Sequence, residues 1–441
     1  MSVTYIPNYK NYKDNIILNI LLDDKEVKKQ KLIENEYITI KLNKNTIYSD
    51  LDKYSKLLNN LQDTSNGKDI IIIISNNSIS NTLYLEHILS KCVKNIIVNP
   101  YKSTINIIIT HNTNKKLKHI ENIVSIITKV EEARKISMIP SNMSQPIILA
   151  KQLKSYFKKY KTKIFDTKYL EKHNFNLIRS VGESSSNKPC ILVIERIINK
   201  NNPTICIVGK GITFDSGGLA IKDLRSMVEM KFDKIGAISS CFSLLHLLEL
   251  KSLENINLVG ILPFAENIIS SSSVHPGDVI KSYSGKTIEI TDPDAEGRLI
   301  LAEALSYSKK YKPSLIIDIA TLTGHADSIN FWHHGYYYAE PSKLKTLVED
   351  LSNDIGERMI PMPSWSEYSN VLESSVADIT NSPINKADSF TAALFLREFI
   401  PKNTDWIHID VAHEFKDGVS QGNGIRSIIH IIEQYIKQKY F

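Results

Sequence analysis

The first part of the chain alternates short β-branched or apolar runs with segments of helical periodicity. The run at 69–75 is apolar without interruption, which is typical of a strand buried on both faces. The alternation predicts an α/β unit. The predicted strands are 15–22, 36–42, 69–75, 94–99 and 104–110, and the predicted helices are 48–61 and 83–93.

A long helix is predicted next, because apolar residues recur at helical spacing from Asn114 to Ser137. Two prolines interrupt the pattern at Pro140 and Pro146, and a further helix is predicted at 147–160. A chain of 441 residues is long enough for two hydrophobic cores. The predicted division is a smaller N-terminal α/β domain at 1–112, a connecting helix at 113–137 and a larger C-terminal domain at 138–441, which carries the candidate chemistry described below.

The rest of the chain repeats the alternation of apolar strands and helices. Such a pattern predicts a mixed, mostly parallel sheet flanked by helices on both faces. In sheets of this kind, ligands bind in loops at the carboxyl ends of the strands. The predicted strands are 190–197, 203–209, 255–264, 286–291, 313–321 and 406–412, and the predicted helices are 232–250, 297–311 and 390–400.

Composition and charge narrow the functional classes. The net charge of +6 is spread along the chain and does not form a basic block, so nucleic acid is not the expected partner. The four cysteines lack the paired spacing of a disulfide framework or a zinc site, which fits a protein in a reducing compartment. The chain has no apolar window of membrane-spanning length and no signal-peptide pattern, so we expect a cytoplasmic protein without a membrane partner.

One stretch concentrates acidic residues: Asp292, Asp294 and Glu296 fall within five residues and Arg298 follows. Two like charges about 4 Å apart repel by roughly 4 kcal/mol at an effective dielectric constant near 20. The side chains could therefore point apart into water at a solvated helix start, or a cation could hold them together. This stretch alone does not separate the two interpretations.

A second stretch, 207–224, adds a glycine-rich loop after an apolar strand, with Lys210 and Asp215 inside it. Glycines allow a loop to fold closely around a small ligand, but the order of residues does not match a phosphate-binding loop. Asp233 heads the next helix, where an N-cap role is the alternative to a ligand role. If the acidic residues of both stretches converge, they could hold two divalent ions.

The chain contains, in this order, the motifs "VGKGITFDSGGLAIK", "MKFDKIGA", "DAEGRLILAEAL" and "DIATLTG". In order and spacing, these motifs resemble the catalytic-domain sequence of the leucyl aminopeptidases, cytosolic aminopeptidases with two metal ions. The similarity covers roughly residues 130–430. The resemblance implies a metal-dependent aminopeptidase that removes the N-terminal residue of peptides, with a leucine-like preference.

The resemblance also implies a ligand set for two divalent ions, usually Zn²⁺, with Mn²⁺ or Mg²⁺ able to occupy the more exchangeable site. Asp215 and Glu296 would bridge the ions, Lys210 and Asp233 would complete the tighter site, and Asp294 would serve the other. A metal-bound Lys210 must lose its proton, and a salt bridge to Asp215 is the alternative for this side chain.

Two further residues match catalytic positions of the family. Lys222 would polarise the scissile carbonyl and stabilise its oxyanion, and Arg298 would hold a bicarbonate ion that acts as general base. A structural arginine at a helix start is the alternative for Arg298. The residues that match substrate-binding positions are Met230, Thr321, Leu322 and Gly324.

Some positions depart from the family pattern. Asp292 and Pro293 stand where the family usually has Asn-Thr, and Lys234 stands where it usually has methionine. These changes bear on specificity and metal affinity. The family is commonly homohexameric, so a homohexamer acting on peptide substrates is expected. The alternative function is DNA binding or another non-catalytic role on the same fold.

Overall fold

The computed structural model describes residues 16–22, 37–42, 70–75, 86, 105–110, 114–328, 334–363, 365–383, 388–411, 415–416 and 419–440. The chain forms two compact units, Met1–Glu132 and Ala133–Phe441. Helix α3 (Asn114–Ser137) has the bounds predicted from periodicity and crosses the border between the units. The three-part division at 1–112, 113–137 and 138–441 stays a prediction.

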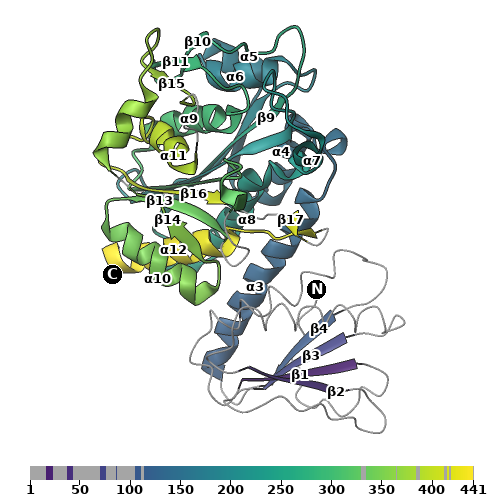
Figure 1. Cartoon of the computed structure of the whole chain (residues 1–441). Coiled ribbons are helices and arrows are strands. Elements are labelled where there is room, and N and C mark those ends of the chain that lie inside the picture. The colour runs from purple at the N-terminus through teal and green to yellow at the C-terminus, as the bar shows by residue number, and fades with distance from the viewer. Residues whose placement is uncertain are drawn as a thin grey trace. The chain divides into compact units, whose positions relative to one another are not determined.

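The first unit contains a four-stranded parallel sheet in the order β2-β1-β3-β4 (Figure 1). Four predicted strands are confirmed with ends that differ by one residue at most. The predicted strand at 94–99 and helix at 48–61 lie outside the described residues, and only Glu86 of the helix at 83–93 is described. The strands are β1 (Ile16–Leu22), β2 (Tyr37–Leu42), β3 (Ile70–Ser75) and β4 (Ile105–Thr110).

The second unit is built on a nine-stranded mixed sheet in the order β14-β13-β16-β12-β7-β9-β6-β5, with β8 paired to β9. Its central strands β16, β12, β7 and β9 are parallel, which confirms the predicted sheet type. The strands are β5 (Lys161–Phe165), β6 (Cys190–Arg196), β7 (Thr204–Gly209), β8 (Gly211–Asp215), β9 (Asn257–Asn267), β12 (Leu315–Ala320), β13 (Gly335–Glu340), β14 (Met359–Pro361) and β16 (Asp405–Val411). The remaining strands are β10 (Asp278–Lys281), β11 (Thr287–Ile290), β15 (Ile379–Thr380), β17 (Phe415–Lys416) and β18 (Val419–Ser420).

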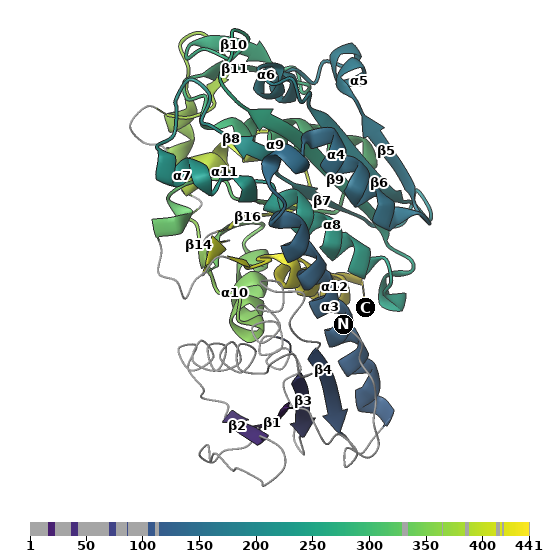
Figure 2. The ribbon, with the colours of Figure 1, turned by 90° about the vertical axis from the view of Figure 1, so that its right-hand side faces the viewer.

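Helices cover both faces of this sheet, as Figures 1 and 2 show for α8 and α9. The chain runs from β7 through α8 to β9 on one side, and from β9 through α9 to β12 on the other side of β7. The direction in which successive strands are added to the sheet therefore reverses at β7. Since parallel crossovers are right-handed, this reversal places α8 and α9 on opposite faces. The helices are α4 (Pro146–Lys154), α5 (Thr167–Lys172), α6 (Asn176–Glu183), α7 (Leu224–Val228), α8 (Ile235–Leu247), α9 (Glu296–Ser308), α10 (Lys343–Ile355), α11 (Ser389–Arg397) and α12 (Ile425–Tyr440).

The same reversal creates a topological switch point between β7 and β12. Crevices for ligands form at the carboxyl ends of strands at such points. Lys210 follows the last residue of β7, and Thr321 follows the last residue of β12. The topology therefore assigns a candidate site to this edge of the sheet.

The glycine-rich stretch is not a loop throughout, which corrects the expectation from sequence. Gly211–Asp215 is strand β8, which pairs in parallel with β9 from Phe264 to Asn267. The irregular register between Ile212 and Asp215 marks a bulge at the end of the strand. Backbone pairing thus fixes the position of Asp215, and the chain leaves the strand only after it.

A buried glutamate ties two segments to α9. Glu303 is fully buried, and its Oε1 accepts hydrogen bonds from the backbone N–H of Leu177 at 2.8 Å and of Tyr283 at 3.3 Å. Burial raises the pKa of Glu303 to about 8, against the opposing effect of the two N–H donors. Among the described residues no group donates a hydrogen bond to its Oε2.

We expect Glu303→Gln to stabilise the second unit increasingly as pH rises. Between the ordinary pKa of 4.5 and the folded value of about 8, the unfolded chain holds fewer protons than the folded chain, so stability falls as pH rises. The glutamine removes this loss. The substitution should therefore raise the free energy of unfolding at pH 8 by on the order of 2–4 kcal/mol more than it does at pH 5. Urea unfolding followed by tryptophan fluorescence measures it, because all three tryptophans lie in this unit. An equal effect of the substitution at pH 5 and pH 8 would contradict this expectation.

No helix within the described ranges combines the length and apolar character that a membrane crossing requires.

Candidate metal centre

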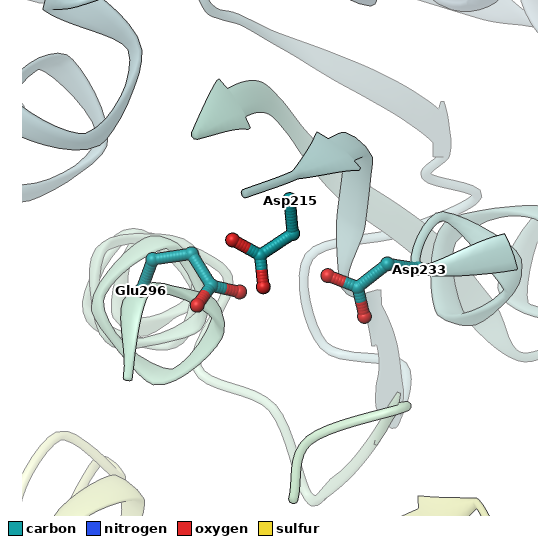
Figure 3. Close-up of side chains that lie close together, drawn as sticks. All are labelled: Asp215, Asp233 and Glu296. Carbon is teal, nitrogen blue, oxygen red and sulfur yellow. The ribbon is translucent and has the colours of Figure 1, made fainter. Parts of the chain in front are cut away.

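Three buried carboxylates from distant parts of the chain meet at the switch point. Asp215 is the last residue of β8, Glu296 is the first residue of α9, and Asp233 follows the short 3₁₀ helix η5 (Met230–Phe232). Each offers an oxygen atom, and these oxygens lie within 4.8 Å of one another. In Figure 3 the three carboxylates face one another. Their side chains are only 2%, 2% and 5% exposed, so water does not screen their repulsion.

Two lysines compensate this negative charge. Lys210 Nζ lies 2.7 Å from Asp233 Oδ1 and 3.0 Å from Glu296 Oε1. Lys222 Nζ lies 3.0 Å from Asp215 Oδ2 and also forms an ion pair with Asp294. The alternative considered for Lys210, a salt bridge to Asp215, is therefore wrong, because Asp215 pairs with Lys222.

The protonation equilibria reflect this crowding. Burial, reinforced by the charges of Glu296 and Asp215, raises the pKa of Asp233 to about 7. Burial and the same two neighbours raise the pKa of Asp294 to about 8. Burial alone would lower the pKa of Lys210, but the three surrounding carboxylates raise it above its ordinary value. The cluster therefore favours any state in which positive charge lies among the carboxylates.

Unpartnered atoms indicate the kind of ligand that fits. Within the described part of the chain, buried Asp233 Oδ2 and Arg298 Nε have no hydrogen-bond partner. Carboxylate oxygens that converge in this way suit hard or borderline divalent cations. The residues present thus fit a metal centre, and the free Arg298 Nε fits a small anion beside it.

Asp294 lies at the edge of the cluster. Its side chain is 32% exposed, and it is not one of the three carboxylates that converge. Its backbone N–H donates to Asp292 Oδ1 at 2.9 Å, and Lys222 links its carboxylate to Asp215. The structure brings Asp294 next to the site, and its ligand role stays a prediction.

Close approach of Lys210 to α9 requires glycine at position 297. A Cβ atom there would lie 2.4 Å from Lys210 Cε and 2.7 Å from Nζ. Gly217 has φ +84°, and a Cβ atom there would lie 2.2 Å from the carbonyl oxygen of Ala220. Both glycines let the chain fold closely around the carboxylates.

The predicted substrate-binding residues flank this cluster. The Thr321 hydroxyl donates to Asp233 Oδ1 at 2.7 Å, and its carbonyl accepts from Lys210 Nζ at 2.8 Å. Leu322 is half-buried, Gly324 is exposed, and Met230 begins η5 half-buried. The structure thus joins Thr321 directly to the site, whereas the pocket roles stay predictions.

Three buried residues that the sequence did not suggest hold the site together. Asn267 Nδ2 donates to Asp215 Oδ1 at 2.8 Å and to the Pro293 carbonyl at 3.2 Å. Asp410 Oδ1 accepts from the backbone N–H of Leu322 at 2.9 Å. Asn381 is the third, through its contacts with 291–295. The sequence assigned no role to these residues, because the partners that reveal it lie tens of residues away along the chain.

The departures from the family pattern have local explanations. Lys234 Nζ donates to the Ile139 carbonyl at 2.6 Å and to Ser144 Oγ at 2.9 Å, so it adds no charge to the carboxylate cluster. Burial lowers the pKa of Lys234 to about 7. The Asp292 carboxylate accepts from the backbone of its own loop, at Asp294 N.

Comparison with known proteins agrees with this geometry. Residues 131–429 match the sequence profile of the cytosol aminopeptidase family, catalytic domain. A Legionella pneumophila (strain Corby) protein named "Probable cytosol aminopeptidase" is 37% identical over 309 residues, which make up 69% of this chain and 63% of that protein. The chain thus spans less than two thirds of this relative's length.

Solved structures share the fold. Leucine aminopeptidase of Caenorhabditis elegans superposes with a TM-score of 0.84 at 21% identity, and the match covers 99% of each chain. A bottromycin maturation enzyme in complex with Mn superposes with a TM-score of 0.83 at 20% identity, over 96% of this chain and 99% of the other. The match of residues 131–429, supported by the curated relative, shows that this chain belongs to the cytosol aminopeptidase family.

Proposed function

We propose that the chain is a metal-dependent aminopeptidase that hydrolyses the N-terminal residue from peptides. The observation that carries this proposal is the convergence of buried Asp215, Asp233 and Glu296 beside Lys210 and Lys222. Family membership supports the same activity. A purely structural role explains the arrangement poorly, because Lys210 and Lys222 bring only two positive charges to four carboxylates, and buried charge that is not fully compensated destabilises a fold.

Two divalent ions are the proposed cofactor, with Zn²⁺, Mn²⁺ or Mg²⁺ as candidates. Asp215 and Glu296 would hold both ions, Lys210 and Asp233 would complete one site, and Asp294 would complete the other. When bound, such a pair lowers the pKa of a water molecule and polarises the scissile carbonyl. Lys210 must then be uncharged, and cations among the carboxylates remove the negative charge that now raises its pKa.

Lys222 and Arg298 are the proposed catalytic residues. The Lys222 ammonium lies 3.0 Å from Asp215 Oδ2 and is partly exposed, so it can stabilise negative charge that develops on the substrate's carbonyl oxygen. Arg298 is buried and donates one hydrogen bond to the Asn381 carbonyl at 2.9 Å. Its free Nε would hold a bicarbonate ion that accepts the proton from the attacking water.

The proposed substrates are peptides with a leucine-like first residue. Met230, Leu322 and the Thr321–Gly324 segment would line the pocket for that side chain. A homohexamer and a cytoplasmic location are proposed from the family resemblance. The DNA-binding alternative is not favoured, since the positive charge of the chain is dispersed.

The test is hydrolysis of a panel of aminoacyl amides by metal-stripped protein with Zn²⁺ or Mn²⁺ restored. Leucine amide should be cleaved only after metal is added, and N-acetyl-leucine amide should resist cleavage because its amine is blocked. Absence of turnover with every metal and every substrate would overturn the proposed function.

A further inference from the structure

The segment 291–295, called the acid loop here, carries Asp294 and leads into Glu296, but it belongs to no strand or helix. Its backbone polar groups therefore need partners other than those of a ladder or a helix. The N–H groups of Asp294 and Ala295 bond within the loop, to Asp292, and most of the partners from outside the loop belong to one side chain. Asn381 follows β15, is fully buried, and is anchored by its own N–H to the Glu289 carbonyl at 2.9 Å.

The Asn381 amide contacts the loop with both ends. Its Oδ1 accepts from Thr291 N at 2.9 Å and from Asp292 N at 3.2 Å. Its Nδ2 donates to the Asp292 carbonyl at 2.7 Å and to the Ala295 carbonyl at 3.5 Å. The amide thus spans the loop from its first residue to its last.

The Asn381 backbone adds a contact with the catalytic machinery. Its carbonyl accepts from Arg298 Nη1 at 2.9 Å. A second buried amide, that of Asn267, donates to both the Pro293 carbonyl and Asp215. The loop is therefore held by two buried amides, and Asn381 supplies the larger number of contacts.

We propose, on the basis of the metal-dependent function above, that Asn381 is a positioning residue that sets Asp294 against the other carboxylates. Glu296 is held by the helical hydrogen bonds of α9, whereas Asp294 lies inside the loop that Asn381 spans. Loss of the amide should therefore displace Asp294 more than Glu296. Of the two metal sites, the one completed by Asp294 should be selectively weakened.

The test uses full-length Asn381→Leu, which keeps the number and branching of the side-chain heavy atoms and removes the amide. Mn²⁺ binding is measured by the electron paramagnetic resonance of free Mn²⁺ in titrations. The weaker binding step should lose about 10–100-fold in affinity, the range found for residues that orient metal ligands. The tighter step should change by less than about threefold. A general loss of protein stability would instead lower the affinity of both Mn²⁺ binding steps by a similar factor.

A matched control comes from Asn257, a buried asparagine at the start of β9. Its Nδ2 donates to the Asn199 carbonyl at 2.7 Å, and its Oδ1 accepts from Ile198 N at 2.8 Å. These contacts lie at the amino end of β9, whereas the candidate site lies at the carboxyl ends of the strands. Asn257→Leu should leave both Mn²⁺ steps unchanged. An equal loss in this control would show that stability, and not positioning, accounts for the effect.

Amide hydrogen exchange gives a readout that does not depend on metal binding. In Asn381→Leu, the amides of Thr291 and Asp292 should exchange at least about tenfold faster, since each loses its acceptor. Wild-type protein that bound no Mn²⁺ would contradict the proposed metal function, yet the exchange rates would still report on Asn381. Unchanged exchange at these amides would overturn the role of Asn381.

Asn381→Asp provides a milder variant if the leucine variant does not fold. It keeps the acceptor for Thr291 and Asp292, and it replaces the donor to the Asp292 carbonyl. The added negative charge should by itself strengthen cation binding. A weaker second Mn²⁺ step in this variant therefore supports positioning, and a stronger one contradicts it.

Discussion

Replacing Glu296 by alanine should abolish peptide hydrolysis. Glu296 is buried, is one of the three carboxylates that converge, and pairs with Lys210 at 3.0 Å. Residues that only orient metal ligands already cost about 10–100-fold when they are changed, so loss of a proposed bridging ligand should lower kcat/KM on the order of 10³-fold or more. Leucine amide hydrolysis at saturating Mn²⁺ measures the loss.

A second glutamate of the same helix serves as control. Glu303 lies two turns further along α9, is equally buried, and contacts backbone groups of Leu177 and Tyr283. Glu303→Gln should retain wild-type activity within about threefold, because no charge of the metal centre is changed. If Glu296→Ala kept an activity within tenfold of wild type, the proposed role of Glu296 as a metal ligand would be wrong.

Replacing Lys222 by methionine should lower kcat with little change in KM. The methionine keeps an unbranched side chain and removes the ammonium that pairs with Asp215 and Asp294. Removal of one group that stabilises a developing oxyanion costs about 10²–10³-fold in kcat. Metal affinity should not fall, because the variant removes a positive charge that competes with the ions for both carboxylates.

Steady-state kinetics and metal titration together test this second expectation. Arg225→Met, at an exposed position of α7, removes a nearby positive charge without touching a carboxylate of the site. This control should keep wild-type kcat. A Lys222→Met enzyme with wild-type kcat, or one that loses activity only because metal is lost, would rule out a direct catalytic role.

Local patterns predicted much of the fold. Helix α3 has the predicted bounds, and strands rich in apolar residues, such as β3 and β12, appear where they were expected. These elements could be predicted because their periodicity and side-chain preferences are properties of consecutive residues. Strand β8 was missed, since the glycines in and around it resemble those of a loop, and its pairing with β9 depends on residues 52 or 53 positions away.

The residues of the candidate site could be predicted from the sequence, but the ion pairs and hydrogen bonds between them could not. The motifs identified Asp215, Asp233 and Glu296 before their convergence was visible. They did not show that Lys210 pairs with Asp233 and that Lys222 pairs with Asp215. Nor did they mark Asn381, whose role follows from contacts with residues about 90 positions earlier.

The sequence by itself determined the family, the alternation of strands and helices, and the identity of the acidic residues, because each of these is written in short contiguous motifs. Only the tertiary structure decided which charges face one another, where the chain reverses its winding around β7, and which buried amides hold the acid loop. The physical reason is that ion pairs and hydrogen bonds act over a few ångströms in space. Their partners are therefore settled by strand order and register, which bring residues such as Asp215 and Glu296 together from 81 positions apart.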